Sequence, residues 1–566
     1  MTTHPSIPLE RRVVALLLCA FFGLFAAVGC SAFVRPASPW AALALLPLLA
    51  APLCHGALAR RLPATWDGLR RARPLLCALW LLLALAALGR SAGVGLYMAD
   101  PQRPQASALW FDPFYVNHSC LSGYWKAAEL SHTPGLNIYQ ERPYEGKQDR
   151  FKLDEYLYPP QFLLLPRAAS ALLGTPADSF LPLRALWFAL DATLLAGAML
   201  ALCTWIGGAA GRRAALLLPA VWLALPTLVT LQTGNFQLPA IALSVLAMLL
   251  FQRGRALAGG ALLALAMVKI FPAILCAYLL FTRRWRALAW SVAFSLLFLA
   301  AAWAVLGAQP FRDFIGYELP RIASGELWAW LELEGLEGVV AINHSVPGLV
   351  FKLRLLGLPG MDHHMMANAA WVWSLALLAI AWLAARHTSA GADVTATATA
   401  TATAATGAKP AALVGANAGA GASADPADTP AARLRLAALW IALLGLAALR
   451  SPFTPDDYAL FPTLWLWCLL AAAAPAGAAA TAALALLWLA LAPVMPFSLA
   501  APAQLPALLA LSTASQLAAL ALCLWFALRH PGDLARAARR PQHSDSNTSS
   551  FPPAGAMSRA RTDSPH

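Results

Sequence analysis

Residues 253–284 read RGRALAGGALLALAMVKIFPAILCAYLLFTRR, an apolar run with arginines at both ends. If one helix crossed a membrane through this run, the two arginine clusters would lie on opposite sides, although basic residues usually collect on the cytoplasmic side. Lys269 and Pro272 interrupt the run near its middle, and proline breaks a helix interior. The stretch therefore predicts a hairpin of two short helices, residues 256–268 and 270–282.

The composition is that of a membrane protein. Of the 566 residues, 60% are hydrophobic and 12% are charged, and the mean hydropathy is +0.62. Soluble globular proteins contain about 25% charged residues, which excludes that class here. We expect an all-α polytopic membrane protein with about 12–14 transmembrane helices and large periplasmic loops.

The positive net charge of +13 does not indicate nucleic acid as a partner, because the arginines occur in clusters at the ends of apolar segments. With the N-terminus inside, about fourteen crossings place each cluster on the cytoplasmic side, next to membrane lipids. This count requires residues 159–173 to lie along the interface and residues 256–282 to turn back. Both termini are then cytoplasmic.

The chain divides by composition into six parts. The expected parts are N-terminal membrane helices (1–98), a first large periplasmic loop with an interfacial helix (99–173), a membrane core (174–386) with a second periplasmic loop (307–365), a disordered Ala/Thr/Gly cytoplasmic linker (387–433), C-terminal membrane helices (434–530) and a disordered cytoplasmic tail (531–566).

Cysteine usage does not indicate disulfides or a metal centre. Eight of the nine cysteines lie in hydrophobic segments, so Cys120 has no obvious partner in a loop. Neither C-x-x-C nor H-E-x-x-H spacing occurs. We therefore expect no metal and no cofactor.

Polar residues occur repeatedly at segment ends assigned to the periplasmic face. A charge at the edge of a bilayer is costly to hold, so repeated placement on one face indicates a shared site. The set comprises Asp112, the Tyr158-Pro159-Pro160 turn, Asn235, Gln237, Lys269, Asn343, His344, Asp456, Asp457 and Tyr458.

Asp112 is the candidate general base. It lies among aromatic residues, next to Tyr115, a few residues after the third predicted span. Reduced access to water there raises the proton affinity of a carboxylate toward a value useful for base catalysis. An interfacial aromatic belt with one solvated carboxylate is the alternative interpretation.

Lys269 lies at the outer turn of the predicted hairpin, where it either snorkels to the interface or binds a phosphate. Asn235 and Gln237 offer amides suited to sugar hydroxyls, although amides also cap helices. Asp456 and Asp457 either form a network with Arg450 or simply make a turn. His344 either shuttles a proton or is solvated.

In their order along the chain, these motifs resemble glycosyltransferase family 87, bacterial membrane enzymes of the GT-C type that use polyprenyl-phosphate sugar donors. The family has an acid-aromatic motif opening its first large outer loop and a Tyr-Pro-Pro turn ending it. A Gly-Gln/Asn turn, a Lys-x-x-Pro hairpin with a basic-Trp cluster, an Asn-x-Ser turn and a Ser-Pro loop follow. The resembling segments, within about residues 110–475, are Asp112-Pro113-Phe114-Tyr115, Tyr158-Pro159-Pro160, Gly234-Asn235-Phe236-Gln237, Lys269-Ile270-Phe271-Pro272 with Arg283-Arg284-Trp285, Asn343-His344-Ser345 and Ser451-Pro452.

The chain departs from the family pattern at several points. Two extra spans precede the large loop, and proline follows the acid where an aromatic residue is usual. The Ser-Pro loop often contains a histidine in relatives, and Asp457 stands at that position here. Asp457 is therefore a possible substitute for that histidine.

The resemblance implies a GT-C-like helical bundle in the bacterial inner (plasma) membrane with a periplasmic active site. It would transfer a hexose, expected to be mannose, from a polyprenyl-phosphate donor to a lipid or glycan acceptor, with inversion. Asp112 would act as the base, and Lys269 would bind the donor phosphate with help from Arg167 or Arg450. The expected sugar or acceptor contacts are Tyr115, Tyr158, Asn235, Gln237, Asn343, His344, Asp456, Asp457 and Tyr458.

A transporter or flippase of a lipid-linked sugar is the alternative. Such a carrier should keep polar residues near the middle of the membrane and often has internal repeats. The chain shows no repeat, and its polar positions lie at one face. The enzyme is therefore the favoured hypothesis.

Overall fold

The computed structural model describes residues 7–34, 45–174, 179–405, 429–475 and 477–529. Leucine and alanine dominate its long helices, and both residues favour helix formation. The apolar helices of the membrane region are α1 (Leu9–Ser31), α2 (Leu46–Arg61), α4 (Pro74–Ala99), α8 (Phe180–Ile206), α9 (Gly208–Leu223), α10 (Leu225–Thr233), α11 (Gln237–Gln252), α12 (Ala256–Ala266), α13 (Ile274–Phe281), α14 (Trp285–Leu306), α19 (His363–Ala405), α20 (Pro430–Ala448), α21 (Asp456–Ala473), α22 (Ala478–Leu491) and α23 (Leu505–Leu528).

Short elements connect these helices. The short α-helices are α3 (Leu69–Ala72), α5 (Pro113–Asn117), α6 (Cys120–Leu130), α7 (Leu164–Leu173), α15 (Gln309–Asp313), α16 (Leu319–Ser324), α17 (Glu337–Ala341) and α18 (Leu349–Leu355). One turn of π-helix, η8, covers Phe314–Glu318. The 3₁₀ turns are η2 (Ala64–Trp66), η3 (Pro104–Ala106), η4 (Arg142–Tyr144), η5 (Pro160–Leu163), η7 (Phe271–Ala273), η9 (Glu326–Glu332), η11 (Phe497–Leu499) and η12 (Pro502–Gln504), and the strands are β1 (Lys147–Gln148) and β2 (Phe151–Lys152).

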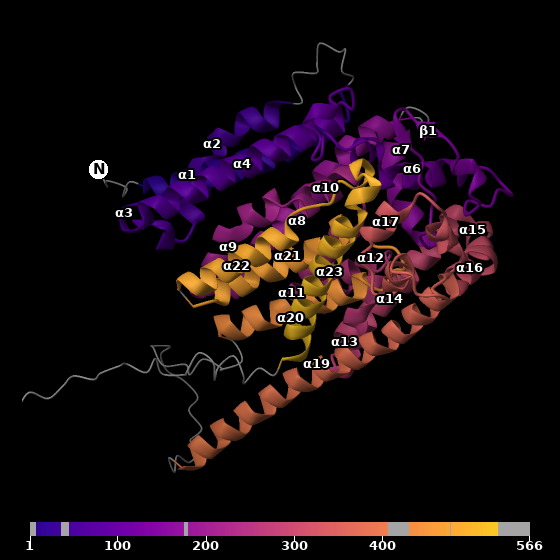
Figure 1. The fold of residues 1–566 in the computed structure, drawn as a ribbon. Coiled ribbons are helices and arrows are strands. Elements are labelled where there is room, and N and C mark those ends of the chain that lie inside the picture. Colours follow the sequence, from indigo (N-terminus) through magenta and orange to yellow (C-terminus); the bar gives the residue numbers. More distant parts are fainter. Residues whose placement is uncertain (1–6, 35–44, 175–178, 406–428, 476, 530–566) are drawn as a thin grey trace, which may run out of the picture. The chain divides into compact units, whose positions relative to one another are not determined.

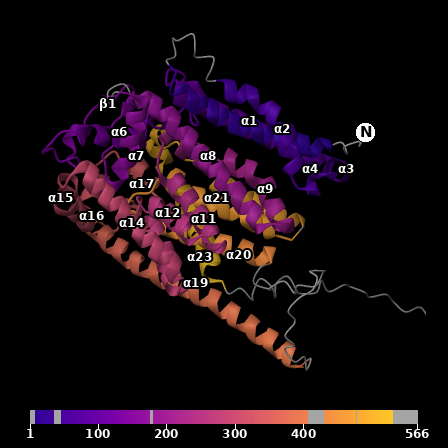
Figure 2. The same cartoon turned by 180° about the vertical axis from the view of Figure 1, so that it is seen from behind.

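The chain is an all-α multi-pass membrane protein. Seven described helices are long and apolar enough to cross a membrane, and the bent pair α9–α10 makes an eighth. This number is lower than the expected 12–14, because α11, α12, η7–α13 and α22 are apolar helices of less than spanning length. The two predicted helices of the hairpin, residues 256–268 and 270–282, coincide with α12 and with η7–α13. Helix α1 packs against α2, α4 and α8, and Figures 1 and 2 show this group from opposite sides.

The predicted hairpin at residues 256–282 is confirmed. Helix α12 packs along α14, and Gly260 lies against the backbone of Trp290 and Ser291 near the start of α14. The first residues of the two helices are therefore at the same end, so the chain between them must turn back. Lys269 lies in that turn, between α12 and η7.

A second break separates α9 from α10. The two helices meet at an angle of 62°, and the backbone N–H of Leu225 donates to the carbonyl of Ala492, 2.9 Å away, at the end of α22. This bond satisfies a backbone donor that the break removes from the helix. Helix α10 ends at Gly234, whose φ of 70° is in the left-handed region that glycine tolerates. The turn presents Asn235 and Gln237 beside the hairpin.

The first outer loop has an aromatic core of its own. Tyr124, Tyr156 and Phe162 are buried there together with Phe151 of strand β2, which pairs antiparallel with β1. The chain then passes through the Tyr-Pro-Pro turn into η5 and α7. Helix α7 has 10 residues, which is too short to cross a membrane.

The loop between α14 and α19, residues 307–362, which corresponds to the expected second outer loop, is attached to the turn between α20 and α21. A bridge pairs Asn343 with Pro455, and the backbone N–H of His344 donates to the Thr454 carbonyl at 2.8 Å. The turn that precedes the two predicted aspartates is thereby fixed against a loop about one hundred residues earlier in the chain.

The expected disordered linker is helical at its start. Helix α19 continues to Ala405, so the structure describes the Ala/Thr repeat up to that residue as helix (Figure 1). Alanine has the highest helix propensity, which allows an existing helix to continue without a packed core. The rest of the linker, residues 406–428, and the predicted tail lie outside the described residues.

We expect Gly260→Ala to destabilise the protein. A Cβ at Gly260 would lie 2.6 Å from Trp290 Cβ, so α12 and α14 would have to separate, at a cost of about 1–3 kcal/mol. Thermal unfolding of the purified protein in detergent measures the effect. In the matched control Gly89→Ala, nothing lies within 4 Å of the added carbon, and the gain in helix propensity should leave the midpoint unchanged or higher. Equal midpoints for the two variants would contradict the close packing of α12 on α14.

Candidate active site

Asp112 is buried at the N-terminus of α5. Its Oδ1 accepts hydrogen bonds from the backbone N–H of Phe114, at 2.8 Å, and from the Ser498 hydroxyl. Pro113 follows at the first helical position, where its missing N–H costs nothing. Oδ2 is buried and has no hydrogen-bond partner in the described part of the chain. The carboxylate is not solvated, which disagrees with the aromatic-belt interpretation, and one oxygen remains free to accept a proton.

Asp456 and Asp457 begin α21 next to Asp112. Oδ1 of Asp456 accepts the Tyr115 hydroxyl at 3.4 Å and the Asp457 N–H at 3.0 Å, and its Oδ2 accepts the Met495 N–H at 2.7 Å. Oδ2 of Asp457 is buried without a partner among the described residues. The N-terminal end of a helix favours negative charge, which helps to hold the two acids. The side chains of Asp112, Asp456 and Asp457 all act electrostatically on Tyr115.

Lys269 contacts a second group of the predicted residues. Its ammonium donates to Oδ1 of Asn235 and lies 5.4 Å from the ring centre of Tyr158 and 5.9 Å from that of Tyr458, within cation–π range. Burial lowers the pKa of Lys269 to about 7, although Cys120 and Asp457 act in the opposite direction. An anion bound beside the ammonium would restore its charge. The lysine is therefore suited to bind an anionic ligand.

Asn235 joins this lysine to the first outer loop. Its Nδ2 donates to Sγ of Cys120 at 3.4 Å, and its Oδ1 also accepts the N–H of Gln237 at 2.9 Å. Sγ of Cys120 is 2.7 Å from the hydroxyl of Tyr458, the residue after Asp457. The side-chain amide nitrogen of Gln237 is buried and has no partner among the described residues. A continuous series of contacts thus links Lys269 to Tyr458, which directly follows Asp456 and Asp457 in the chain.

Tyr158 of the Tyr-Pro-Pro turn is part of the same group. Its hydroxyl is 2.8 Å from that of Tyr124, and its ring stacks on Phe162 with the ring centres 4.6 Å apart. Its carbonyl accepts the Tyr139 hydroxyl at 3.0 Å. These contacts hold the ring in position beside Lys269.

Asn343 and His344 are close to the acids but have complete sets of partners. The Asn343 amide donates to the Pro452 carbonyl at 2.9 Å and accepts the N–H groups of Ser345 and Thr454, each at 3.0 Å. The His344 ring bonds to Ser515 Oγ at 2.8 Å and to the Ile342 carbonyl at 2.9 Å. Both residues therefore fix the second outer loop in this structure, and direct contact with a sugar stays a prediction.

The two arginines predicted to assist Lys269 lie elsewhere. Arg167 on α7 contacts Ser131 and His132 at 3.2 Å each, and Arg450 donates to Ser374 Oγ at 3.0 Å. Neither makes a hydrogen bond or ion pair to the Lys269 group in the described part of the chain. A role for either arginine in binding the donor phosphate stays a prediction. Asp457 is the acid that acts on Lys269.

Several residues of the site were missed by the sequence analysis. Lys352 is buried and donates to Gln516 Oε1 at 2.9 Å and to Ser512 Oγ at 3.2 Å. Burial lowers its pKa to about 7, and Asp456 partly opposes this shift. Gln232 accepts the Ala108 N–H at 2.6 Å and donates to the Tyr115 carbonyl at 2.7 Å, so it attaches α10 to the Asp112 loop. A lysine within an apolar stretch was a usable signal for Lys352; nothing in the sequence distinguishes Gln232.

The segment between α22 and α23 covers the acids. Phe497 packs edge-on against Phe114, with ring centres 4.8 Å apart, and against Tyr115 at 6.1 Å. The next residue, Ser498, bonds to Asp112, and Met495 bonds to Asp456. The sequence analysis assigned no role to this segment, because its residues are common in ordinary loops.

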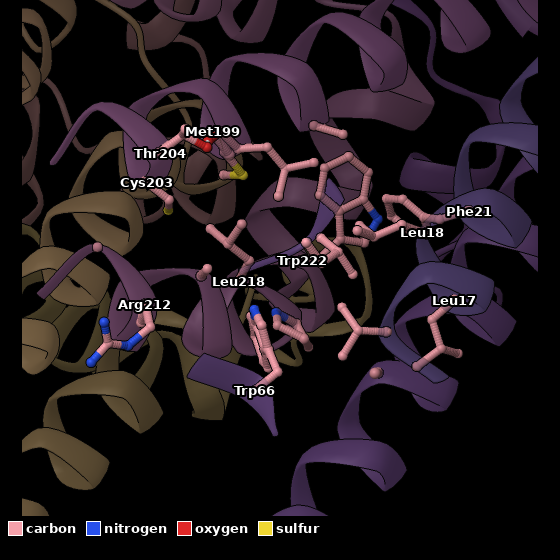
Figure 3. Close-up of a pocket in the computed structure, with 18 of the residues that line it drawn as sticks. Leu17, Leu18, Phe21, Trp66, Met199, Cys203, Thr204, Arg212, Leu218 and Trp222 are labelled. Atoms are coloured by element: carbon pink, nitrogen blue, oxygen red, sulfur yellow. The ribbon is translucent and has the colours of Figure 1, made fainter. Parts of the chain in front are cut away.

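A separate apolar cavity of about 370 Å³ lies between α1, α4, α8 and α9. Figure 3 shows Phe21, Met199, Leu218 and Trp222 around it, with Arg212 at one side. None of the polar residues described above lines it. The cavity is therefore distinct from the candidate active site.

Comparison with known proteins gives one match. The model of glycosyltransferase family 87 matches residues 156–414, which include the Tyr-Pro-Pro turn, the Asn235 turn, Lys269 and the Asn343 turn. No curated protein and no solved structure matches the chain.

His344 should make the fold sensitive to acid. Burial lowers its pKa to about 3 from an ordinary value of 6.5, and Lys352 adds to the shift. Below pH 6.5 the unfolded chain binds a proton that the folded chain does not, so stability is complete above pH 6.5 and falls as the pH drops toward 3, by up to about 1.4 kcal/mol per pH unit.

His344→Gln removes this proton uptake. Its unfolding midpoint should therefore fall less steeply than that of the unsubstituted protein between pH 7 and pH 5, measured by thermal unfolding in detergent. The control His364→Gln changes an exposed histidine and should retain the original slope. If His344→Gln and His364→Gln show the same slope, His344 is not the acid-sensitive group.

Proposed function

We propose that this chain, which belongs to glycosyltransferase family 87 and is therefore a membrane glycosyltransferase, transfers a hexose from a polyprenyl-phosphate donor to a lipid or glycan acceptor. The observation that supports this reaction is the series of contacts from Lys269 through Asn235 and Cys120 to Tyr458, the residue next to Asp457. Lys269, at one end of the series, is suited to bind an anion. Asp457, next to the other end, has a carboxylate oxygen without an internal partner among the described residues. We propose mannose as the hexose and the periplasmic face as the location.

Asp112 is the proposed general base. Its Oδ2 has no internal partner, so it would take the proton from the acceptor hydroxyl while that oxygen attacks the anomeric carbon. The bond from the anomeric carbon to the phosphate oxygen breaks as the new bond forms, and the configuration inverts. Asp457, whose Oδ2 is also unpartnered among the described residues, is the proposed second acceptor in the same pocket.

Lys269 is the proposed partner of the leaving group. Polyprenyl phosphate leaves as an anion, so it requires charge stabilisation rather than protonation. A partly buried ammonium interacts strongly with such a charge because the surrounding dielectric is low. The aromatic rings of Tyr158 and Tyr458 beside it would pack on the donor, and Asn235 and Gln237 would orient sugar hydroxyls.

The acceptor must reach Asp112 past the segment that contains Phe497 and Ser498. Ser498 is exposed, and the segment belongs to a turn between two helices rather than to the helix core. We propose that this turn moves aside when the acceptor enters. Its return would exclude water, which would otherwise compete for the sugar.

Asp112→Asn should abolish transfer without loss of fold. The amide keeps the size of the side chain but cannot take a proton, and loss of a general base typically lowers the rate by about 10²–10⁴-fold. Transfer is measured with purified protein and a synthetic polyprenyl-phosphate hexose. The control Asp149→Asn changes an exposed aspartate of the same loop and should retain full activity. Full activity in Asp112→Asn would remove Asp112 from the role of base.

Lys269→Ala should weaken donor binding. Polyprenyl phosphate without sugar should raise the unfolding midpoint of the unsubstituted protein, because a ligand that binds only the folded state stabilises it. The rise should be lost in Lys269→Ala and retained in Lys147→Ala, which removes an exposed lysine from β1. A flippase would show the same binding but no transfer, so the two measurements together distinguish the enzyme from a carrier. An undiminished rise in Lys269→Ala would exclude Lys269 from phosphate binding.

A further inference from the structure

Three side chains with metal-binding atoms meet beside α6 in the first outer loop. His118, Cys120 and Asp154 each offer one ligand atom, and the three atoms lie within 4.8 Å of one another. Nε2 of His118 is 3.5 Å from Sγ of Cys120, and its Nδ1 is 3.6 Å from Oδ1 of Asp154. A tetrahedral zinc ion with bonds of 2.0–2.3 Å holds its ligand atoms about 3.4–3.6 Å apart. The thiol and the imidazole already have that separation.

The fold brings the third ligand to the other two by a close backbone approach. Asp154 follows strand β2, and its N–H donates to Ser122 Oγ at 3.1 Å, while the Ser122 hydroxyl donates to the Lys152 carbonyl at 2.8 Å. A Cβ at Gly123 would lie 2.5 Å from the Asp154 carbonyl oxygen, so only glycine allows this contact. Helix α6 and strand β2 therefore hold the carboxylate beside the thiol.

Neighbouring groups orient the other two ligands. The His118 ring stacks on Phe114, with the ring centres 4.6 Å apart and the planes 16° from parallel. Sγ of Cys120 lies 2.7 Å from the Tyr458 hydroxyl and 3.4 Å from Asn235 Nδ2, two donors suited to a thiolate. Metal sites typically have such outer partners, which fix the ligands and tune the ion.

We propose that His118, Cys120 and Asp154 bind one zinc-type divalent cation. Sulfur, imidazole nitrogen and carboxylate oxygen together are zinc ligands, whereas magnesium and calcium prefer oxygen alone. Three protein ligands leave a fourth position for water or for an oxygen of a ligand. This inference differs from the sequence expectation of no metal, because a His-x-Cys pair with a distant aspartate matches none of the familiar spacings.

A coordinated cation displaces the thiol proton of Cys120 to water and leaves a thiolate. The thiolate and the Asp154 carboxylate together balance the two positive charges of the ion.

The cation would lie next to the proposed donor site. Asn235 contacts both Cys120 and Lys269, so one residue separates the ion from the ammonium. Two positive centres in one pocket would attract a phosphate more strongly than one. The binding of the ion itself does not depend on the proposed sugar transfer and is measured without any substrate.

The test is a metal titration of the full chain in detergent. The protein is first freed of metal with a chelator and then titrated with Zn²⁺, and bound zinc is counted by elemental mass spectrometry. We expect one equivalent per chain, and Co²⁺ in place of Zn²⁺ should give the near-ultraviolet absorption of a cobalt–thiolate bond. Cys120→Ser and Asp154→Asn should lower the affinity at least about tenfold, and the cobalt–thiolate band should be absent from Cys120→Ser.

Cys30→Ser is the matched control, because Cys30 is an exposed, free cysteine remote from this cluster. It should bind one equivalent with unchanged affinity. Zn²⁺ should also raise the unfolding midpoint of the unsubstituted protein and of Cys30→Ser, but not of Cys120→Ser. If Cys120→Ser fails to fold, the affinity of Asp154→Asn decides. Absence of stoichiometric zinc in the unsubstituted protein, or unchanged affinity in Cys120→Ser or Asp154→Asn, overturns the proposal, whatever the outcome of the transfer assay.

Discussion

Lys269 places a charged amine in a turn between two apolar helices, which costs free energy. Neighbouring residues of the site partly offset this cost. The hairpin brings the amine to the end of the helices, where Asn235 accepts its hydrogen bond and two tyrosine rings face it. No carboxylate forms an ion pair with it in the described part of the chain. The ammonium is therefore only partly compensated by the protein, which is the condition expected of a group that completes its environment with a bound anion.

The acids of the site have unpartnered hydrogen-bond acceptors, whereas Lys269 has an only partly compensated positive charge. Asp112 and Asp457 each have one buried carboxylate oxygen without an internal partner among the described residues, and the side-chain nitrogen of Gln237, on the Lys269 side, is unpartnered there as well. Buried polar groups are nearly always paired, so several exceptions in one region indicate a place where a polar ligand supplies the missing bonds. A sugar has hydroxyl groups of the required kind, whereas the cavity shown in Figure 3 is almost entirely apolar.

The sequence predicted most of the helices, and several of its candidate site residues contact one another in the structure. The positions of the arginines and the break at Lys269 and Pro272 were sufficient to predict the hairpin, because they indicate where the chain turns. The short motifs indicated Asp112, Asn235 and Lys269, because a polar residue inside an apolar run is informative by itself. The sequence did not separate short helices from spanning ones, since α11 and α12 are as apolar as any full span.

Contacts between distant segments were the part that the sequence could not provide. Arg167 and Arg450 were expected to assist Lys269, but in the structure they bond to Ser131 and His132 and to Ser374, contacts that depend on how α7 and the turn after α20 pack. Gln232, Ser498 and the approach of Asp154 to Cys120 depend on backbone distances that no local pattern encodes. The start of the expected linker is helical because alanine continues α19 without tertiary support.

The bond from Leu225 to Ala492 has a consequence for how much of the chain an active protein needs. The family match ends at residue 414. Three features of the site come later in the chain: the Ala492 carbonyl that accepts the Leu225 N–H, the segment with Ser498 that bonds to Asp112, and the two acids at the start of α21. Asp112 itself precedes the matched region. A fragment trimmed to the matched residues would keep Lys269 but would lack Asp112, Asp456 and Asp457, so the folded unit is larger than the segment that matches the family.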